Sequence, residues 1–390
     1  MAEPPRLFVD VSEIIKQDAQ SGIQRVVRAI WSELRRRDGQ NFTLAPVYAT
    51  RSQGYCHARI DFLDQPTGAL SDVPVRARQG DIFLGLDLAA GLLPKYREQI
   101  REWRAQGASI HIVVYDLLPL TRPEWFTPIT GVNFRKWFNL LAEQADHAIC
   151  ISNQVASEVK ERLGTAAERR GLVVRTIQLG GDIAASSPSK DISLGVKQLL
   201  ERLRFRPSIL MVGTVEPRKG HDCALAAFDH LWSKGDYGAP DLVIVGKGGW
   251  KTANLQERIR SHPEQGKRLH WLEGVSDEGL CQLYKASNGM LVASHGEGFG
   301  LPLLEAAMHD RPVLARSLPV FQEQRLPNIS YFEDDSPEQL GSALLNLSTI
   351  RQGCSVTPSL LPKWSDSVDG LLNVLGLDPN PATETSNVRG

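Results

Sequence analysis

The sequence predicts an α/β protein with two domains, each a parallel sheet covered by helices on both faces. Three observations lead to this fold class. The chain has 390 residues, which is more than one ordinary hydrophobic core accommodates. Short apolar runs alternate with amphipathic stretches almost from end to end, and strict alternation of strands and helices builds parallel sheets. A small, polar, proline-containing stretch at 180–192 interrupts the alternation, and we interpret it as an interdomain linker.

The first domain begins with a predicted buried strand at 6–11 and a helix at 22–37. The apolar residues of this helix, from Ile23 to Leu34, follow the i, i+3, i+4, i+7 spacing of an amphipathic helix. Asn153 is a plausible N-cap for a later helix because its side chain can accept a backbone hydrogen bond. The remaining elements are strands at 81–86, 110–116 and 147–152 and helices at 95–107 and 153–164.

The alternation restarts after the linker. Strands are predicted at 208–213, 241–246, 269–274, 289–294 and 312–316, and helices at 223–235, 254–262, 277–287 and 302–310. Two such blocks are typical of twin Rossmann-like domains with a cleft between them, and ligands in this architecture bind beyond the carboxyl ends of the strands. The polar residues 379–390 are expected to form a frayed tail.

Composition and charge narrow the class of protein. Hydrophobic residues make up 42% of the chain and charged residues 23%, as in globular proteins. A net charge of -1 gives no reason to expect nucleic-acid binding. The five cysteines are odd in number, widely separated and without a CxxC spacing, which argues against a disulfide framework and a zinc site and favours a reducing compartment.

The sequence favours a cytoplasmic location. The first ten residues contain an acidic residue and two prolines but no apolar signal segment, and no run of about 18 apolar residues predicts a membrane-spanning helix. Peripheral contact with the inner membrane is a further possibility, because basic residues at 35–37 and 95–104 could meet anionic lipid headgroups. A solvated helix face is the other interpretation of these residues.

One stretch, "SHGEGFGLPLLEAAMHDRP" at 294–312, places glutamates on both sides of a glycine-rich turn. Gly298 and Gly300 permit close approach of the backbone to a ligand, and Pro302 suits the first turn of the following helix. The amides from Phe299 to Leu303 would favour negative charge. Helix-dipole complementarity or solvation would explain either glutamate alone, but neither explains both carboxylates flanking the turn.

A second stretch, "MVGTVEPRKG" at 211–220, offers positive charge after a strand that ends at Gly213. Arg218 provides bidentate donors for phosphate oxygens and Lys219 provides a compact charge, so the pair can bind a diphosphate. A solvated basic turn is the alternative. The glycines of 246–250 are weak evidence on their own, because they do not form a GxGxxG motif.

Together, "EGFGLPLLEA" and "VGTVEPRKG" resemble the signature of the GT4 family of retaining glycosyltransferases, which have the GT-B fold. Glu297 and Glu305 match the family's spacing of two glutamates with seven residues between them. The resemblance covers nearly all of the second half and continues more loosely in the first, through "AICISNQVASEV" and "YDLLPL". The N-terminal "RLFVDVSEIIKQDAQSGIQRVVRAI" is similar to mannosyltransferases that build bacterial O-antigen polysaccharides.

This resemblance implies roles for the donor-binding residues. Arg218 and Lys219 would bind the donor diphosphate, and Glu297 would contact hydroxyls of the transferred sugar. Glu305 would hold the ribose hydroxyls, and the backbone near Val275 would meet the base. Residues near the turn that would line the same donor site are Gly213, Gly298, Phe299, Gly300 and Leu301.

The resemblance also implies contributions from the first domain. Gly22 would lie near the phosphates or the acceptor, and Asp116 would face the reacting sugar. Tyr115 stands where many relatives have histidine, and a tyrosine with a pKa of about 10 is a poor base at neutral pH. No Asp-x-Asp metal motif occurs, so Arg218 and Lys219 are expected to replace a metal electrostatically. No cofactor is expected besides the nucleotide-sugar substrate.

The resemblance further implies how the chain is divided. Residues 1–185 would bind the acceptor, a glycan or lipid-linked oligosaccharide, and 186–363 the donor. Residues 364–378 would form a helix that crosses back to the first domain. The implied activity is transfer of a hexose, with GDP-mannose favoured over UDP-sugars or dTDP-rhamnose. A nucleotide-sugar-binding protein without activity is the alternative. An oxidoreductase would want GxGxxG after the first strand, where only Gly22 is present.

Overall fold

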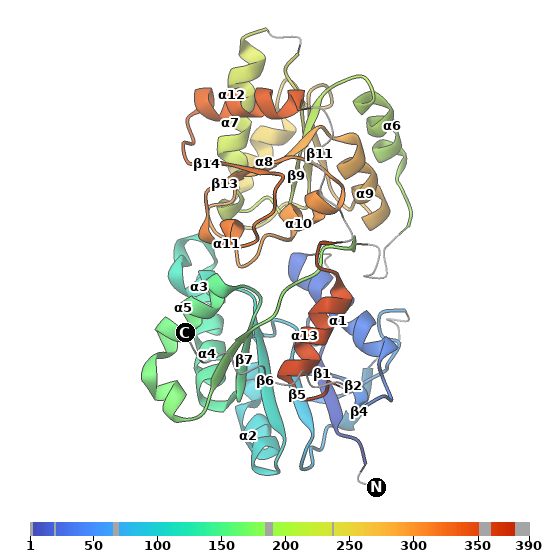
Figure 1. Cartoon of the computed structure of the whole chain (residues 1–390), viewed down its shortest axis with the longest axis vertical. Helices are drawn as coiled ribbons and strands as arrows, with labels where there is room; N and C mark the ends of the chain where they lie inside the picture. The colour runs from blue at the N-terminus through green and yellow to red at the C-terminus, as the bar shows by residue number, and fades with distance from the viewer. Residues whose placement is uncertain are drawn as a thin grey trace, which may run out of the picture.

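The computed structural model describes residues 3–18, 21–64, 70–183, 190–235, 238–350 and 360–378. They form two α/β domains, one above the other in Figure 1, each built on its own sheet. The two-domain α/β class predicted from the alternation of strands and helices is confirmed. Six residues of the expected linker, 184–189, and the expected tail at 379–390 lie outside the described residues.

The first domain contains an eight-stranded sheet in the order β4-β3-β2-β1-β5-β6-β7-β8. Six neighbouring strands of this sheet are parallel, namely β2, β1, β5, β6, β7 and β8. Strands β3 and β4 add an antiparallel edge that the sequence pattern did not predict. The strand bounds are β1 Arg6–Asp10, β2 Thr43–Tyr48, β3 Cys56–Ala58, β4 Leu70–Pro74, β5 Ile82–Gly85, β6 Ser109–Val114, β7 His147–Cys150 and β8 Val173–Thr176.

Five α-helices belong to the described part of the first domain: α1 Gly22–Arg36, α2 Arg97–Ala105, α3 Leu118–Thr121, α4 Pro128–Gln144 and α5 Asn153–Arg169. Short 3-10 segments, η1 Leu93–Tyr96 and η2 Pro123–Trp125, lie between them. Helix α1 begins with a capping box formed by Ser21 and Gln24. At α5 the cap is Ser152, whose Oγ accepts from the Val155 amide at 3.1 Å. The predicted cap, Asn153, is instead the first helical residue.

The second domain contains a fully parallel six-stranded sheet in the order β11-β10-β9-β12-β13-β14. Its strands are β9 Ser208–Val212, β10 Asp241–Val245, β11 Leu269–Leu272, β12 Gly289–Val292, β13 Val313–Arg316 and β14 Ile329–Phe332. Its helices are α6 Leu194–Leu203, η4 Pro217–Lys219, α7 His221–Ser233, α8 Ala253–Arg260, α9 Asp277–Ala286, α10 Leu301–Met308, α11 Pro319–Gln322 and α12 Pro337–Thr349.

The last helix, α13 Trp364–Val374, packs against α1 of the first domain. The Trp364 amide donates to Asp182 Oδ1 at 2.8 Å, and the Gly181 amide donates to the Pro362 carbonyl at 3.1 Å. The two chain segments that pass between the domains therefore lie side by side. Phe299 and Leu304 of the second domain share one buried apolar cluster with α1 and α13, so the domains are joined by a hydrophobic interface as well.

The basic side chains on α1 and α2 are paired with carboxylates. Arg35, Arg36 and Arg37 at the end of α1 contact Asp64, Glu33 and Asp369, respectively. On α2, Arg97, Arg101 and Arg104 contact Glu143, Glu98 and Asp146. These pairs favour the solvated-face interpretation of both helices. Within the described residues, no helix has the length and apolar character needed to cross a membrane.

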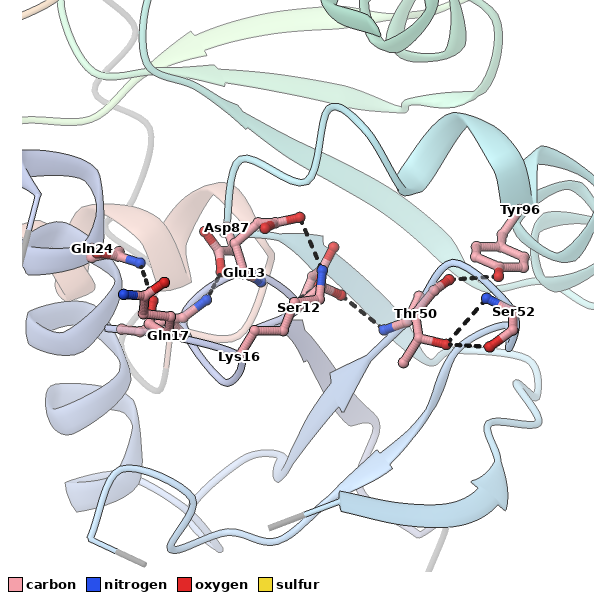
Figure 2. Close-up of polar contacts among 12 residues, drawn as sticks. Ser12, Glu13, Lys16, Gln17, Gln24, Thr50, Ser52, Asp87 and Tyr96 are labelled. Atoms are coloured by element: carbon pink, nitrogen blue, oxygen red, sulfur yellow. Dashed lines mark hydrogen bonds and ion pairs between the residues drawn. The ribbon is translucent and has the colours of Figure 1, made fainter. Parts of the chain in front are cut away.

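Two carboxylates are buried where the strand order of the first sheet reverses direction: Asp10 ends β1 and Asp87 follows β5. Asp10 Oδ2 accepts from the Tyr55 hydroxyl at 2.7 Å. Asp87 Oδ2 accepts from the amides of Glu13 and Ile14 at 2.8 and 2.7 Å, and Figure 2 shows Asp87 beside Glu13. Burial raises the pKa of Asp10 to about 6. Burial, with Asp10 nearby, raises the pKa of Asp87 to about 7.

Replacing Asp87 by asparagine should change how stability depends on pH. Between pH 4 and 7 the unfolded chain has lost the Asp87 proton and the folded chain still holds it, so wild-type stability falls through this window by about 1.4 kcal/mol per unit of pKa shift. The free energy of unfolding of the wild type minus that of Asp87→Asn should therefore fall as the pH rises. Urea titrations at several pH values measure it.

The difference between the two proteins is the informative quantity, because buried histidines give the opposite slope. Burial lowers the pKa of His111 to about 4 and that of His221 to about 3, and both contributions cancel in the comparison. Asp64→Asn, at a mostly exposed position, serves as the control and should leave the pH dependence unchanged. A constant difference between wild type and Asp87→Asn from pH 4 to 7 would contradict the prediction.

Candidate functional site

The glutamate loop, residues 293–300, connects the carboxyl end of β12 to α10. Glu297 lies in this loop, between two cations that follow β9. Its Oε2 accepts from Arg218 Nη1 at 2.7 Å, and its Oε1 accepts from Lys219 Nζ and, at 2.7 Å, from the Ser294 hydroxyl. Arg218 Nε also pairs with Glu216 Oε1 at 2.8 Å. The structure thus brings together three of the residues predicted from two motifs about 80 positions apart.

The electrostatics of this cluster keep Glu297 charged. Only 10% of its side chain is exposed, and burial raises its pKa, but the charges of Arg218 and Lys219 outweigh burial and lower the pKa to about 2. Glu297 is therefore an acceptor of hydrogen bonds at neutral pH and cannot act as an acid there. Arg218 and Lys219 form the positive side of the site, since both cations lie beyond the carboxyl end of β9.

Close packing fixes the turn between the two glutamates. Gly300, the N-cap of α10, has φ of +91°, a conformation that favours glycine. A Cβ atom there would also lie 2.5 Å from the Phe321 ring. The side chain of Phe299 is buried, and its carbonyl accepts from Gln324 Nε2. Leu301 begins the helix, one residue before the predicted start at 302, and the predicted turn precedes it.

Glu305 is more enclosed than the sequence suggested. Only 1% of its side chain is exposed, and both of its oxygens have partners. Oε2 accepts from the Tyr284 hydroxyl at 2.8 Å, and Oε1 accepts from Arg25 Nη1 of the first domain. Arg25 also donates to Asp277 Oδ1 at 3.3 Å. No pattern in the sequence indicates these contacts, because Arg25 occupies a polar position of an amphipathic helix.

Asp116, at the carboxyl end of β6, meets the glutamate loop from the first domain. A Cβ atom on Gly298 would lie 1.8 Å from the Tyr115 carbonyl oxygen and 3.1 Å from the Asp116 Cβ, so only glycine allows this approach of the two domains. Burial raises the pKa of Asp116, although Arg218 nearby lowers it. Asp116 therefore shares the electrostatic field of Arg218 with Glu297.

Tyr115, which the resemblance aligns with a histidine of many relatives, points away from the site. Its hydroxyl donates to the Leu86 carbonyl at 2.7 Å, and its ring is buried in the apolar cluster between β1, α1 and α13. Burial raises the pKa of this hydroxyl far above its usual value. Tyr115 is therefore a packing residue that supports Asp116 and not a base.

Replacing Tyr115 by phenylalanine should leave turnover within about threefold of wild type, because the hydroxyl faces the core. The loss of one buried hydrogen bond should lower the free energy of unfolding by about 1–2 kcal/mol. Initial rates and urea titrations measure the two effects. A loss of turnover of 100-fold or more in a folded Tyr115→Phe protein would mean that the hydroxyl acts on substrate.

A further contact between the domains lies beside the glutamate loop and was missed by sequence reasoning. Trp250 Nε1 donates to the Trp125 carbonyl at 2.7 Å. Lys251 Nζ donates to the carbonyls of Glu124 at 2.7 Å and Phe126 at 3.0 Å. A Cβ atom on Gly296 would lie 2.8 Å from the Trp125 ring. The glycine-rich 246–250 loop, a weak signal in the sequence, thus joins the second domain to the first through Trp250.

The remaining predicted residues, Gly22, Gly213 and Val275, lie at or beside the ends of helices and strands. Gly22 is the first residue of α1. Gly213, at the end of β9, has φ of +146°, and a Cβ atom there would lie 3.5 Å from Lys219 Cε. Val275 lies before α9 and packs on the apolar cluster of the second domain. In the described part of the chain, no group of three His, Cys, Asp or Glu side chains is arranged to hold a metal ion.

Comparisons with known proteins give the site its context. Residues 206–349 match the family model described as glycosyl transferases group 1. The chain is 41% identical over 348 residues to the serotype-specific mannosyltransferase WbdA of Escherichia coli, covering 87% of this chain and 41% of that protein. It is 27% identical over 207 residues to O-antigen chain mannosyltransferase B of Escherichia coli, covering 52% of each. The chain thus spans about two fifths of the length of its WbdA relatives.

Solved structures show the same fold. HepE of Anabaena, solved in complex with UDP and glucose, matches with a TM-score of 0.63 at 15% identity, covering 96% of this chain and all of that chain. Sucrose-phosphate synthase of Thermosynechococcus elongatus matches with a TM-score of 0.61 at 16% identity, covering 96% and 94%. These matches confirm the GT-B fold predicted from the sequence.

Proposed function

The chain carries a glycosyl transferases group 1 domain on a GT-B fold, and we propose that it is a retaining hexosyltransferase acting on a nucleoside-diphosphate sugar. The observation that carries the proposal is the ionised, buried Glu297 between Arg218 and Lys219, facing Asp116 across the domain interface. Two of its relatives are named as a serotype-specific mannosyltransferase and an O-antigen chain mannosyltransferase. These names favour GDP-mannose as donor and a growing polysaccharide or lipid-linked glycan as acceptor.

In this proposal the two cations carry the electrostatic part of the reaction. Arg218 and Lys219 neutralise the diphosphate as the sugar–phosphate bond breaks and its electron pair moves to the phosphate oxygen. Glu297 accepts hydrogen bonds from sugar hydroxyls, and the amides near Phe299 to Leu301 lie beside the leaving group. Two fixed positive charges perform the role that a divalent cation has in other nucleotide-sugar sites, so we propose that the reaction needs no metal.

The proposed mechanism is attack from the face that the diphosphate leaves. The acceptor hydroxyl oxygen forms a bond to the anomeric carbon, and its proton passes to the departing phosphate oxygen. This route needs no enzymic base. It suits this site because Tyr115 is buried and because Glu297, with its pKa lowered to about 2, has little affinity for a proton. Asp116 would lie on the first-domain side of the reacting sugar, where its negative charge stabilises the positive charge that develops at the anomeric carbon.

A donor screen tests this function. The protein is incubated with GDP-mannose, UDP-hexoses and dTDP-rhamnose, each with and without a mannose-containing acceptor, and nucleotide release is measured. Acceptor-dependent release from one donor, unchanged in EDTA, is the expected result. Full loss in EDTA with recovery in manganese would overturn the metal independence alone. No release from any donor would favour the alternative of a nucleotide-sugar-binding protein without activity.

A further inference from the structure

Arg25 bridges the two domains at the carboxylate assigned to the donor ribose. It lies in the first turns of α1, and its guanidinium contacts Glu305 through Nη1 and Asp277 through Nη2, residues 280 and 252 positions away. Ser21 and Gln24 cap this end of α1, and Gln24 Nε2 donates to the Gln17 carbonyl at 2.7 Å, as Figure 2 shows. The helix therefore presents Arg25 to the second domain from a fixed backbone.

This ion pair conflicts with ribose binding at Glu305. A ribose diol must reach the carboxylate oxygens, but the Glu305 side chain is only 1% exposed, with Tyr284 against Oε2 and Arg25 against Oε1. The Tyr284 hydroxyl is buried within the second domain together with Glu305, whereas Arg25 comes from the other domain. Arg25 is thus the partner that must leave when a ribose binds.

A displaced Arg25 keeps Asp277 but loses the carboxylate of Glu305. Its side chain is only 13% exposed, and a buried guanidinium that loses one of its carboxylate partners is stabilised by a replacement anion. Its Nε is buried and has no hydrogen-bond partner among the described residues, so the group has donor capacity that Glu305 and Asp277 do not use. The donor's diphosphate, attached to the ribose, is a bidentate acceptor that a guanidinium fits well.

We propose that Arg25 is a donor-binding residue of the first domain that exchanges Glu305 for the donor diphosphate when the ribose takes its place. This inference rests on the proposed function, since it takes Glu305 as the ribose carboxylate. Arg25 becomes a third cation for the diphosphate, added to Arg218 and Lys219 from the opposite domain. Donor binding then replaces a direct contact between the domains with one that runs through the donor.

The test compares ligands that differ only in their phosphates. Dissociation constants for GDP, UDP and dTDP, and for guanosine, uridine and thymidine, are measured by calorimetry for wild type and Arg25→Ala. For the base that the wild type prefers, Arg25→Ala should weaken the nucleoside diphosphate about tenfold or more, as loss of a charge-assisted contact does. Binding of the nucleoside should be unchanged or tighter, because Glu305 is freed. The dissociation constant of the nucleoside diphosphate for Arg25→Lys should lie between those for wild type and Arg25→Ala.

Arg28→Ala is the matched control. Arg28 lies one turn further along α1 and, like Arg25, approaches Asp277, in this case at 3.9 Å, but it pairs with Asp18 at 3.0 Å in place of Glu305. It should show no selective loss of the diphosphate ligand. If Arg25→Ala weakened binding of the nucleoside and of the nucleoside diphosphate equally, the role of Arg25 would be purely structural. If binding of both became tighter, Arg25 would only compete with the ribose for Glu305. Either result overturns this inference alone. A wild type that binds no nucleoside diphosphate overturns the proposed function together with it.

Discussion

Replacing Glu297 by glutamine should lower kcat for glycosyl transfer by about 100- to 1,000-fold, the range seen when one preorganised electrostatic contact is removed from an active site. The amide keeps the shape of the side chain but loses the charge that Arg218 and Lys219 hold in place. Binding of the nucleoside diphosphate should become tighter, because the Glu297 carboxylate no longer neutralises Arg218 and Lys219. Initial rates and calorimetry on the same preparation separate the two effects.

A matched control for this substitution lies in the segment between α8 and β11. Glu264 pairs with Arg268 at 2.8 Å, so Glu264→Gln also removes a paired carboxylate but at a distance from the glutamate loop. It should keep wild-type kcat and wild-type nucleotide binding. A Glu297→Gln enzyme that turns over at the wild-type rate would remove Glu297 from the mechanism.

Replacing Arg218 by alanine should have the largest combined effect on binding and stability. Arg218 is the shared partner of Glu297 and Glu216, and its removal leaves buried carboxylates with less compensation. We expect the free energy of unfolding to fall by about 3 kcal/mol and the dissociation constant of the nucleoside diphosphate to rise about 100-fold. Urea titration and calorimetry measure the two quantities.

A second substitution distinguishes the two effects of Arg218→Ala. Adding Glu216→Gln removes one of the stranded charges, so the double variant should regain part of the lost stability while nucleotide binding stays weak. Arg260→Ala, at a half-exposed position on α8 that faces Glu273 at 3.8 Å, should change neither quantity. Full recovery of binding in the double variant would mean that Arg218 acts only by neutralising Glu216.

The features that could be predicted from the sequence are local ones. The strands β9 and β10 are short apolar runs followed by glycines, and β12 is an apolar run that begins with one. The turn before α10 combines two glycines with a proline, so these segments contain their own signals. The edge strands β3 and β4 lack such a signal, because β4 is exposed along most of its length and has no alternating apolar pattern. Helix α4 was also missed, although Thr127 caps it and Pro128 begins it.

The contacts between the domains could not be predicted in the same way. Arg25 and Glu305 are 280 positions apart, and an arginine on the polar face of a helix is usually solvated. Glu323 after α11 accepts from the amides of Asn153 and Gln154 at 3.0 Å each, an interaction between the second domain and the start of α5 that no motif indicates. The sequence identified the chemical groups of the site, but their arrangement across the interface depends on tertiary structure.

The paired crossings between the domains have a mechanical consequence. The segments near Gly181 and Pro362 are hydrogen-bonded to each other, and a Cβ atom on Gly180 would lie 2.2 Å from the Trp364 amide nitrogen. The two adjacent chain crossings act as a hinge. They restrict twisting and sliding of one domain against the other and leave rotation about the line through the crossings as the least restricted motion. The contact of α11 with α5 lies on the other side of the interface from α13 in Figure 1.

Rotation about such a hinge separates the far side of the interface most and the region beside the axis least. Gly181 packs against Leu304, with 2.5 Å between its ideal Cβ position and Leu304 Cγ, which places Glu305 near the axis. The contact between Arg25 and Glu305 therefore changes little with a small rotation, whereas the Glu323 contact with α5 must break for the interface to open widely. The geometry of the chain crossings thus sets which contacts yield first.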